Sequence, residues 1–290
     1  MRGGQRQVLL LMDGLRKRRH TCVLLARKGR PLARAAIAAG FETHPARLAS
    51  LWRRSAEADI VHVHDARAHL LAALGSRQKF VVSRRVAFAI GRSALSEWKY
   101  ARARRYLAVS HFVAERLIES GIPDTWIDVV YDAVERVAPG DAWSPLHPAV
   151  GLASADPQKG RDLLVAAADQ AKISLVLSGN LSDDLRRASM FVYLTRSEGL
   201  GSAALLAMSM GVPVIASRVG GLQEIVEDGV SGLLVENEPA EIAAAMQRLL
   251  QDPELSHRLI QNARANVEAR FTQNHLVAAT LASYRRALAH

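Results

Sequence analysis

The chain has 290 residues, of which 49% are hydrophobic and 23% are charged. This length suits two domains that can each bury a core, and the composition excludes a long disordered tract. No apolar run approaches the roughly 20 residues that span a bilayer. The single cysteine, Cys22, excludes an intramolecular disulfide and favours a reducing, cytoplasmic location.

The net charge of +10 is distributed unevenly along the chain. Residues 1–145 hold 25 Lys and Arg against 13 Asp and Glu (+12), whereas residues 146–290 hold 13 against 15 (−2). The first half is therefore a cationic module and the second is nearly neutral. Nucleic acid, anionic lipid and phosphorylated acceptors are the partner classes that such a field attracts.

The N-terminus is basic and contains an apolar stretch, so a signal peptide has to be considered. That stretch is short, is interrupted by Asp13, and is followed by basic residues rather than by a small-residue cleavage site. We therefore expect no signal peptide.

The first half alternates strand-like and helix-like segments, which indicates βαβ units and a parallel sheet. The expected strands are 20–26, 59–64, 80–84, 106–109 and 127–131. The expected helices are 5–18, 31–39, 66–74, 93–104 and 111–120. The stretch 135–148 has three prolines and a glycine, and is the best candidate for a linker.

The second half begins the alternation again. Its expected strands are 149–153, 173–178, 191–195, 213–217 and 232–235. The final stretch, 239–290, has a helical pattern with breaks near Asp252-Pro253 and Phe271-Thr272.

The most informative run is 191–235, which contains two glycine-rich turns, each leading from the end of a strand into a helix. Open parallel sheets bind ligands at this end of their strands, and a helix N-terminus there favours an anion such as a phosphate. Glu198 stands beside the first glycines, where its carboxylate suits a neutral, hydroxyl-rich group. The run therefore fits a ligand with phosphate at one end and a sugar at the other.

The same run resembles the donor-site signature of retaining nucleotide-sugar glycosyltransferases of family 4. The matching residues are Glu198-Gly199-Leu200-Gly201, Ala207-Met208, Gly211-Val212-Pro213-Val214 and Gly220-Gly221 with Glu224. An ordinary α/β domain whose glycines only serve turns is the alternative. The resemblance implies an α/β protein of GT-B fold, with two Rossmann-like parallel-sheet domains facing across a cleft.

The resemblance also implies domain boundaries. Residues 1–140 correspond to an acceptor-side domain and residues 141–272 to the nucleotide-sugar-binding domain. Residues 273–290 correspond to a helix that packs back towards the first domain.

On the donor side, the resemblance assigns catalytic roles to Lys159 and Glu198. Lys159 would offset the charge of a leaving diphosphate, and Glu198 would contact the transferred sugar. The donor-binding set comprises Gly3, Gly4, Lys159, Glu198, Gly199, Leu200, Gly201 and Ser202. A solvated lysine at a helix start is the alternative for Lys159.

Three departures from the family pattern bear on the donor site. The arginine that usually precedes the lysine is absent, and the glutamate that usually holds the ribose is replaced by Leu206. Only 39 positions separate Lys159 from Glu198, about half of the family's usual span, so one βα crossover is expected to be missing. Glu224 lies too far along to replace that glutamate, and fits a first-turn helix carboxylate equally well.

A further departure concerns the front of the chain. Gly3-Gly4 resembles the glycine-rich turn that follows the family's first strand, but no strand precedes it in this sequence. We expect either that the natural start lies upstream or that the first domain lacks its central strand. Loss of that strand would expose the edges of its neighbours.

The acceptor side is assigned to His64, Asp65, Arg84 and Arg85, which follow two expected strands. An arginine directed into a cleft suits an anionic partner, since guanidinium groups match phosphate oxygens. Structural strand-end residues and a solvated basic loop are the alternatives. His62 and His64 have the spacing of metal ligands, but the resemblance implies no metal and no other cofactor.

The segment 93–106 is basic and amphipathic, with Trp98 and Tyr100 among its cations. Such a helix suits peripheral contact with the anionic inner face of the plasma membrane, although a solvated face explains it as well. No nucleic-acid motif accompanies it, and we expect no nucleic-acid partner.

These observations favour a hexosyltransferase-type glycosyltransferase that moves a sugar from a UDP-, GDP- or ADP-sugar, with retention, to a glycan or lipid acceptor of the cell envelope or surface. A degenerate, non-catalytic GT-B relative that acts as a binding protein is the second hypothesis. A nucleic-acid-binding protein is the third.

Overall fold

The computed structural model describes residues 3–88, 90–91, 93–135 and 140–289. The chain divides into two compact units. The first comprises Met1–Ala133 and Gln273–His290, and the second comprises Val134–Thr272. Part of the expected linker, residues 136–139, lies outside the described residues.

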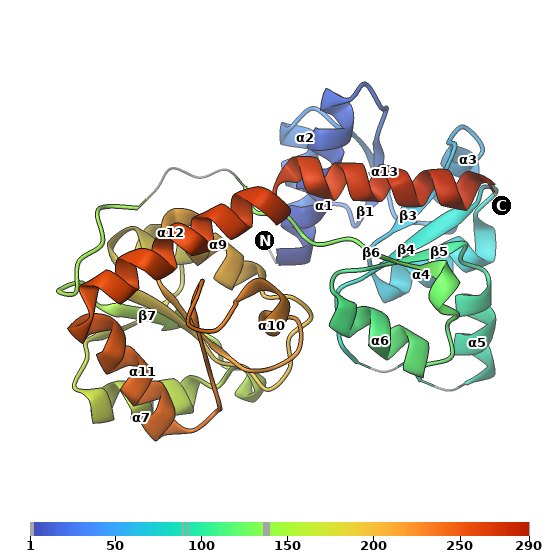
Figure 1. The fold of residues 1–290 in the computed structure, drawn as a ribbon. Helices are drawn as coiled ribbons and strands as arrows, with labels where there is room; N and C mark the ends of the chain where they lie inside the picture. Colours follow the sequence, from blue (N-terminus) through green and yellow to red (C-terminus); the bar gives the residue numbers. More distant parts are fainter. Residues whose placement is uncertain (1–2, 89, 92, 136–139, 290) are drawn as a thin grey trace. The chain divides into compact units, whose positions relative to one another are not determined.

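The first unit contains two parallel sheets (Figure 1). β1 (Val23–Ala26) pairs with β2 (Glu42–Pro45), while β3 (Val61–Val63), β4 (Phe80–Arg84), β5 (Arg105–Ala108) and β6 (Ile127–Val129) pair in that order. In the described part of the chain, β1 and β3 share no ladder, so each is an edge strand. The connecting helices are α2 (Pro31–Ala38), α3 (Leu48–Ser55), α4 (Ala66–Gly75), α5 (Ala94–Ala101) and α6 (His111–Glu119).

Two helices from opposite ends of the chain pack together in the first unit (Figure 1). These are α1 (Gly3–Lys17) and α13 (Gln273–Ala289). The Gln273 amide donates to the Leu10 carbonyl over 2.9 Å, and Leu11, Leu15, Leu276 and Val277 share one buried cluster. A methyl group on Gly14 would come within 2.4 Å of Val277, so the small residue permits the close approach of these helices.

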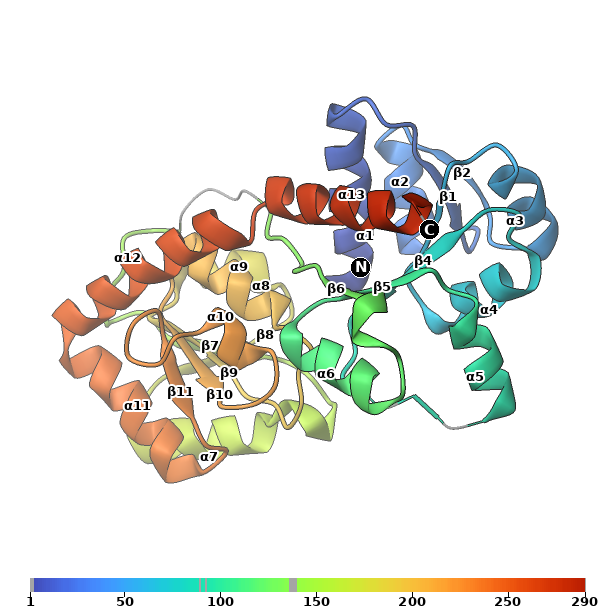
Figure 2. The ribbon, with the colours of Figure 1, turned by 45° about the vertical axis from the view of Figure 1, so that its right-hand side comes forward.

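The second unit is a five-stranded parallel sheet in the order β11-β10-β9-β7-β8 (Figure 2). The strands are β7 (Ala149–Leu152), β8 (Leu175–Ser178), β9 (Met190–Tyr193), β10 (Val214–Ser217) and β11 (Leu233–Val235). The chain leaves β7 in one direction to form β8 and returns to the other side of β7 to form β9. A topological switch point therefore lies between β7 and β9, where open α/β sheets bind ligands.

Helices cover the second sheet and close its core. They are α7 (Arg161–Ala171), α8 (Leu181–Asp184), α9 (Ser202–Met210), α10 (Leu222–Ile225), α11 (Pro239–Gln251) and α12 (Pro253–Arg270). One face of the sheet buries apolar side chains of α7 and α11, including Leu164, Ile242 and Met246. Between β8 and β9 the chain forms the short α8 and a single 3-10 turn, Leu185–Arg187.

The predicted α/β class with parallel sheets is confirmed, and every strand and helix that we expected has a counterpart in the structure. The sequence analysis missed β2 and α3. β2 has the sequence ETHP, which lacks an apolar alternation, and α3 buries only Leu51 and Ser55 while Leu48 and Trp52 are exposed. β2 therefore lacks the alternation on which strand prediction depends, whereas Leu48, Leu51 and Trp52 do have helical spacing, and α3 was overlooked.

Among the described residues, no helix combines the length and the apolar character that crossing a membrane requires.

Candidate functional site

The loops after β7 and β9 meet at the switch point of the second unit. The first carries Lys159, at the end of a 3-10 turn, and the second carries Glu198. The Arg196 amide donates to the Gln158 carbonyl over 2.9 Å, which links the two loops through their backbones. Residues 39 positions apart are thereby brought into contact.

Lys159, Glu198 and Tyr193 form one hydrogen-bonded cluster. The Lys159 ammonium lies 2.7 Å from a Glu198 carboxylate oxygen and 3.2 Å from the Tyr193 hydroxyl. The Tyr193 hydroxyl donates to the same Glu198 oxygen. The Lys159 and Glu198 side chains are 25% and 18% exposed, so both charges are within reach of a ligand.

Tyr193 was not among the residues that we predicted for the site. It is the last residue of β9. Burial raises its pKa above the usual value, and the charge of Glu198 raises it further, so the hydroxyl keeps its proton and donates to the carboxylate. The signal available in the sequence was a polar tip on the final residue of a strand, directly before the glycine loop.

Two glycines set the shape of these loops. Gly160 adopts a φ of +56°, which glycine tolerates and most residues do not, and it leads Lys159 into α7. Gly221 lies so close to the loop before α9 that a methyl group there would come within 2.1 Å of the Gly199 carbonyl oxygen. The Gly221 amide also donates to the Glu198 carbonyl over 3.1 Å, so the loop after β10 holds the backbone at Glu198 in place.

The helices that begin at these loops, α7 and α9, have glycine at the N-cap. Gly160 and Gly201 supply no side chain to bond the first amide groups. An uncapped N-terminus leaves backbone N–H groups available to an anion. Two further predicted donor residues differ in exposure: Ser202 is exposed in the first turn of α9, whereas Leu200 is buried.

A polar network anchors the Glu198 loop to the neighbouring strand ends. The Ser217 hydroxyl donates to the Asn237 side-chain oxygen (2.6 Å) and accepts from the Thr195 amide (2.9 Å). The Asn237 amide donates to the Thr195 carbonyl over 3.1 Å. Sequence analysis did not single out these residues, which join loops from three different strands.

Leu206 lies half-buried on α9, and its apolar side chain can form no hydrogen bond. Glu224 lies in the first turn of α10, and its backbone carbonyl accepts from Arg270 over 3.2 Å.

In the first unit, a second cluster joins two of the predicted acceptor-side residues, His64 and Arg85, and one new residue. Arg85 donates to Asp132 over 2.8 Å and lies 3.2 Å from His64. Asp132, which follows β6, was not predicted, because the sequence does not show which residue an aspartate after a strand will contact. Gly4, in the first turn of α1, lies near Arg85: a methyl group there would be 3.7 Å from the Arg85 Cδ.

The other predicted residues of this unit have different surroundings. Gly3 begins α1, so the expected glycine turn forms the start of a helix. Arg84 donates to the Tyr100 hydroxyl over 3.3 Å and to the Phe88 carbonyl. Asp65 is the N-cap of α4 and accepts from the Ala68 amide over 2.8 Å. Arg84 and Asp65 thus have structural partners that do not include the Arg85 cluster.

His62 is held by two hydroxyl groups, of Tyr284 (2.7 Å) and Ser83 (2.8 Å). Burial and the charge of Arg85 lower its pKa to about 3, and burial, His62 and Arg85 lower the pKa of His64. Both rings are therefore neutral at pH 7. Within the described residues, no group of three or more His, Cys, Asp or Glu side chains is arranged to hold a metal ion.

The chain thus consists of two parallel-sheet units of Rossmann-like type, one of which carries a lysine and a carboxylate in contact at its switch point. Comparison with known families agrees. Residues 1–136 match the Glycosyltransferase Family 4 model, and residues 168–266 match the Glycosyl transferases group 1 model. The first half of the chain thus resembles the one domain and the second half the other domain of group 1/family 4 glycosyltransferases.

Solved structures resemble the fold along nearly the whole chain. HepE of Anabaena, crystallised with UDP, has a TM-score of 0.82 at 17% identity, over 97% of this chain and 96% of that one. The lipopolysaccharide outer core galactosyltransferase WaaB has a TM-score of 0.68 at 16% identity, over 98% and 95%. The predicted GT-B fold is thereby confirmed.

In sequence, the chain is similar to the D-inositol 3-phosphate glycosyltransferase of Acidothermus cellulolyticus. The two are 38% identical over 146 residues, which is 48% of this chain and 32% of that protein. The chain therefore aligns with about a third of the length of this relative.

We predict that Gly221→Ala destabilises the second unit by about 1–3 kcal/mol, because the added methyl group meets backbone atoms that cannot move aside. Gly179→Ala is the matched control, since nothing lies within 4 Å of its added methyl group. Chemical denaturation of both variants measures the difference. Equal stability would contradict the close approach of Gly221 to Gly199.

We also predict that acid weakens the first unit before its carboxylates titrate. Burial and Lys99 lower the pKa of His69 to about 4, and His62 and His64 are lowered as well. Below about pH 6.5 these histidines take up protons in the unfolded chain but stay neutral in the folded protein. The free energy of unfolding therefore falls by up to about 1.4 kcal/mol per pH unit and group.

Thermal unfolding between about pH 7.5 and about pH 5 tests this dependence, because that range lies above the ordinary carboxylate pKa values. His62→Gln, which cannot take up a proton, should reduce the slope. An unchanged slope in this variant would refute the role of His62.

Proposed function

We propose that the protein is a hexosyltransferase-type glycosyltransferase that moves a sugar from a nucleotide diphosphate-sugar to an acceptor, with retention at the sugar carbon. The observation that carries the proposal is the meeting of Lys159, Glu198 and Tyr193 at the switch point, beside the uncapped start of α9. A cation, a carboxylate and free backbone amides at one sheet edge suit a ligand that has both phosphate and sugar.

The positive groups would act on the leaving diphosphate. Negative charge accumulates on it as the glycosidic bond breaks, and the Lys159 ammonium together with the amides at the start of α9 would stabilise that charge. In the free protein, Glu198 and Tyr193 hold the ammonium at the loop end, which limits its conformational freedom before the donor arrives.

The carboxylate would act on the sugar. Glu198 accepts hydrogen bonds from Lys159 and Tyr193 through one oxygen and from the Gly199 amide through the other. Held in this way, it can accept from a sugar hydroxyl and orient the ring. The acceptor would attack on the face from which the diphosphate departs, a course that retains configuration and needs no protein nucleophile.

The comparisons favour particular substrates. Structures similar in fold were solved with UDP and with UDP-glucose, so we expect a uridine nucleotide ahead of GDP- and ADP-sugars. Relatives are named for inositol 3-phosphate and for the lipopolysaccharide outer core, so we expect a phosphorylated or envelope-glycan acceptor. Such chemistry fits a cytoplasmic enzyme in peripheral contact with the membrane.

We predict that a UDP-sugar raises the melting temperature of the protein and that Lys159→Ala and Glu198→Ala abolish the rise. A ligand at a hundredfold excess over its Kd adds about 2.7 kcal/mol to the stability of the folded state. Tyr193→Phe, which removes one hydroxyl, should weaken the shift without abolishing it. Differential scanning against UDP-, GDP- and ADP-sugars measures the effect.

Matched controls exist in the same unit. Lys172→Asn removes an exposed lysine at a φ of +58°, which asparagine tolerates, and Glu268→Ala removes an exposed glutamate late in α12. Both should keep the full shift. If a donor binds but no sugar is transferred to any acceptor, the hypothesis of a non-catalytic GT-B relative replaces that of an active glycosyltransferase. If no donor binds to a folded sample, the donor site itself is refuted.

A further inference from the structure

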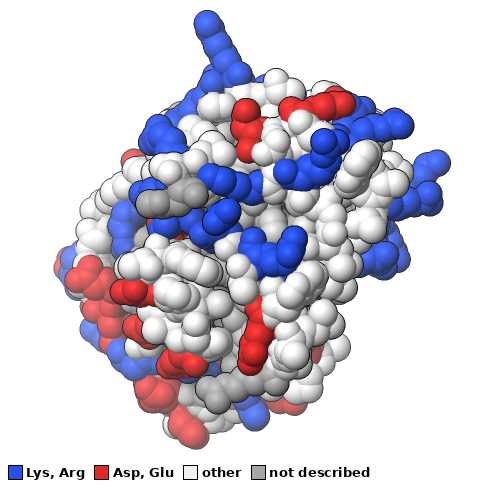
Figure 3. Space-filling view, turned by 90° about the vertical axis from the view of Figure 1, so that its right-hand side faces the viewer, with Lys and Arg blue, Asp and Glu red and all other residues white. Residues whose placement is uncertain are grey.

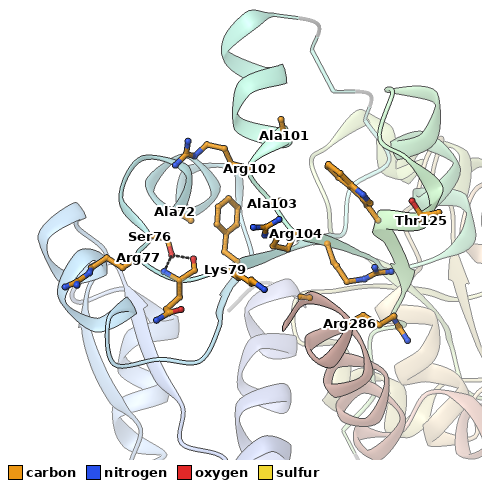
Figure 4. A pocket seen from close by; sticks show the side chains of 15 residues that line it. Ala72, Ser76, Arg77, Lys79, Ala101, Arg102, Ala103, Arg104, Thr125 and Arg286 are labelled. Atoms are coloured by element: carbon orange, nitrogen blue, oxygen red, sulfur yellow. Dashed lines mark hydrogen bonds between the residues drawn. The ribbon is translucent and has the colours of Figure 1, made fainter. Parts of the chain in front are cut away.

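A cavity of about 750 Å³ lies at the amino ends of β4, β5 and β6 in the first unit (Figure 4). The His64, Arg85 and Asp132 cluster follows the carboxyl ends of β3, β4 and β6, so the cavity lies at the opposite end of the strands. It is therefore a separate feature from the predicted acceptor side. Its walls come from the turn before β4, the turn before β5, the 3-10 turn Asp124–Trp126 and the end of α13.

The lining of this cavity is strongly basic. Its six cationic side chains are Arg77, Lys79, Arg102, Arg104, Arg105 and Arg286, and no Asp or Glu of the described residues is part of the wall. In the close-up, Lys79, Arg104 and Arg286 come from different elements around one opening, whereas Arg77 extends away from its centre (Figure 4). Figure 3 shows Lys and Arg side chains gathered on one face of the molecule.

A nearby carboxylate neutralises part of this charge. Asp128 bonds Arg105 over 2.9 Å and Arg286 over 2.7 Å, and it also accepts from Ser283. Burial raises the pKa of Asp128, but the bonds from Arg105 and Ser283 outweigh that effect and lower it. The aspartate is thus ionised and offsets one of the six charges.

Three of the other cations have neutral partners. Lys79 donates to the Leu288 carbonyl over 3.1 Å, and the Arg77 and Arg102 guanidinium groups lie over the rings of Trp52 and Trp98. Helices α4 and α5 end beside the cavity, and their carbonyl ends favour Arg77 and Arg102. The helix ends therefore explain the positions of Arg77 and Arg102. They give no reason for Lys79 and Arg104 to converge on the same opening from the separate turns before β4 and β5.

We propose that this cavity is an anion site that takes a phosphate-bearing ligand. Guanidinium groups match phosphate oxygens in pairs, and an ammonium adds a third contact, so Arg104, Arg286 and Lys79 offer complementary donors. The exposed Trp126 in the wall supplies an amphipathic ring beside them. A free phosphate compound and a phospholipid headgroup share this chemistry. The proposal is independent of the donor site, whose residues lie in the second unit.

The test uses two probes on the full chain, inorganic pyrophosphate and phosphatidylcholine vesicles with or without phosphatidylglycerol. Tryptophan fluorescence reports pyrophosphate binding, because Trp126 lines the cavity and Trp52 and Trp98 contact two of its arginines. A Lys159→Ala background removes any contribution from the proposed donor site. Sedimentation reports vesicle binding. We expect pyrophosphate to bind, and the variant Lys79→Gln/Arg104→Gln to weaken its binding by at least about tenfold, since charged hydrogen bonds are lost.

Arg27→Gln/Lys28→Gln is the matched control, because it removes one arginine and one lysine from an exposed loop of the same unit. It should leave binding unchanged within about twofold, since neither residue lines the cavity and exposed charges are screened by salt. Pyrophosphate binding alone would identify a free phosphate compound as the ligand. Added binding to the phosphatidylglycerol vesicles would identify a lipid headgroup. The proposal is overturned if neither probe binds, or if both double variants lose the same amount of binding affinity.

Discussion

The candidate donor site depends on one close contact between backbones in the second unit. Gly221 approaches the Gly199 carbonyl so nearly that no side chain fits between them, and its amide bonds the Glu198 carbonyl. This contact fixes the loop after β9, which places Glu198 beside Lys159 and Tyr193. The positions of these side chains at the switch point therefore depend on a close backbone contact that only glycine permits.

The first unit uses the two ends of its strands differently. At the carboxyl ends, burial keeps His62 and His64 neutral while Arg85 is paired with Asp132. At the amino ends, cations outnumber the single aspartate that offsets them. Part of the positive charge of the first half thus lines this cavity and, with Arg286, makes it cationic.

Prediction from sequence succeeded where a pattern was local and failed where it was not. The glycine loops and most of the helices were identified. β2 was missed because it lacks an apolar alternation, and α3 was overlooked although Leu48, Leu51 and Trp52 have helical spacing. Lys159 and Glu198 were predicted through a family resemblance, and the structure brings them within 2.7 Å. Tyr193 and Asp132 were missed, because a polar residue at a strand end does not reveal its partner.

The sequence by itself determined the α/β class, the cationic first half, and the glycine positions that mark the turns. These properties follow from composition and from preferences that act over a few residues. Only the tertiary structure decided which charges meet. Lys159 and Glu198 come together because β7 and β9 are neighbours, and Lys79, Arg104 and Arg286 because their elements end around one cavity. Pairing of distant strands brings such groups together, and no short stretch of sequence encodes that pairing.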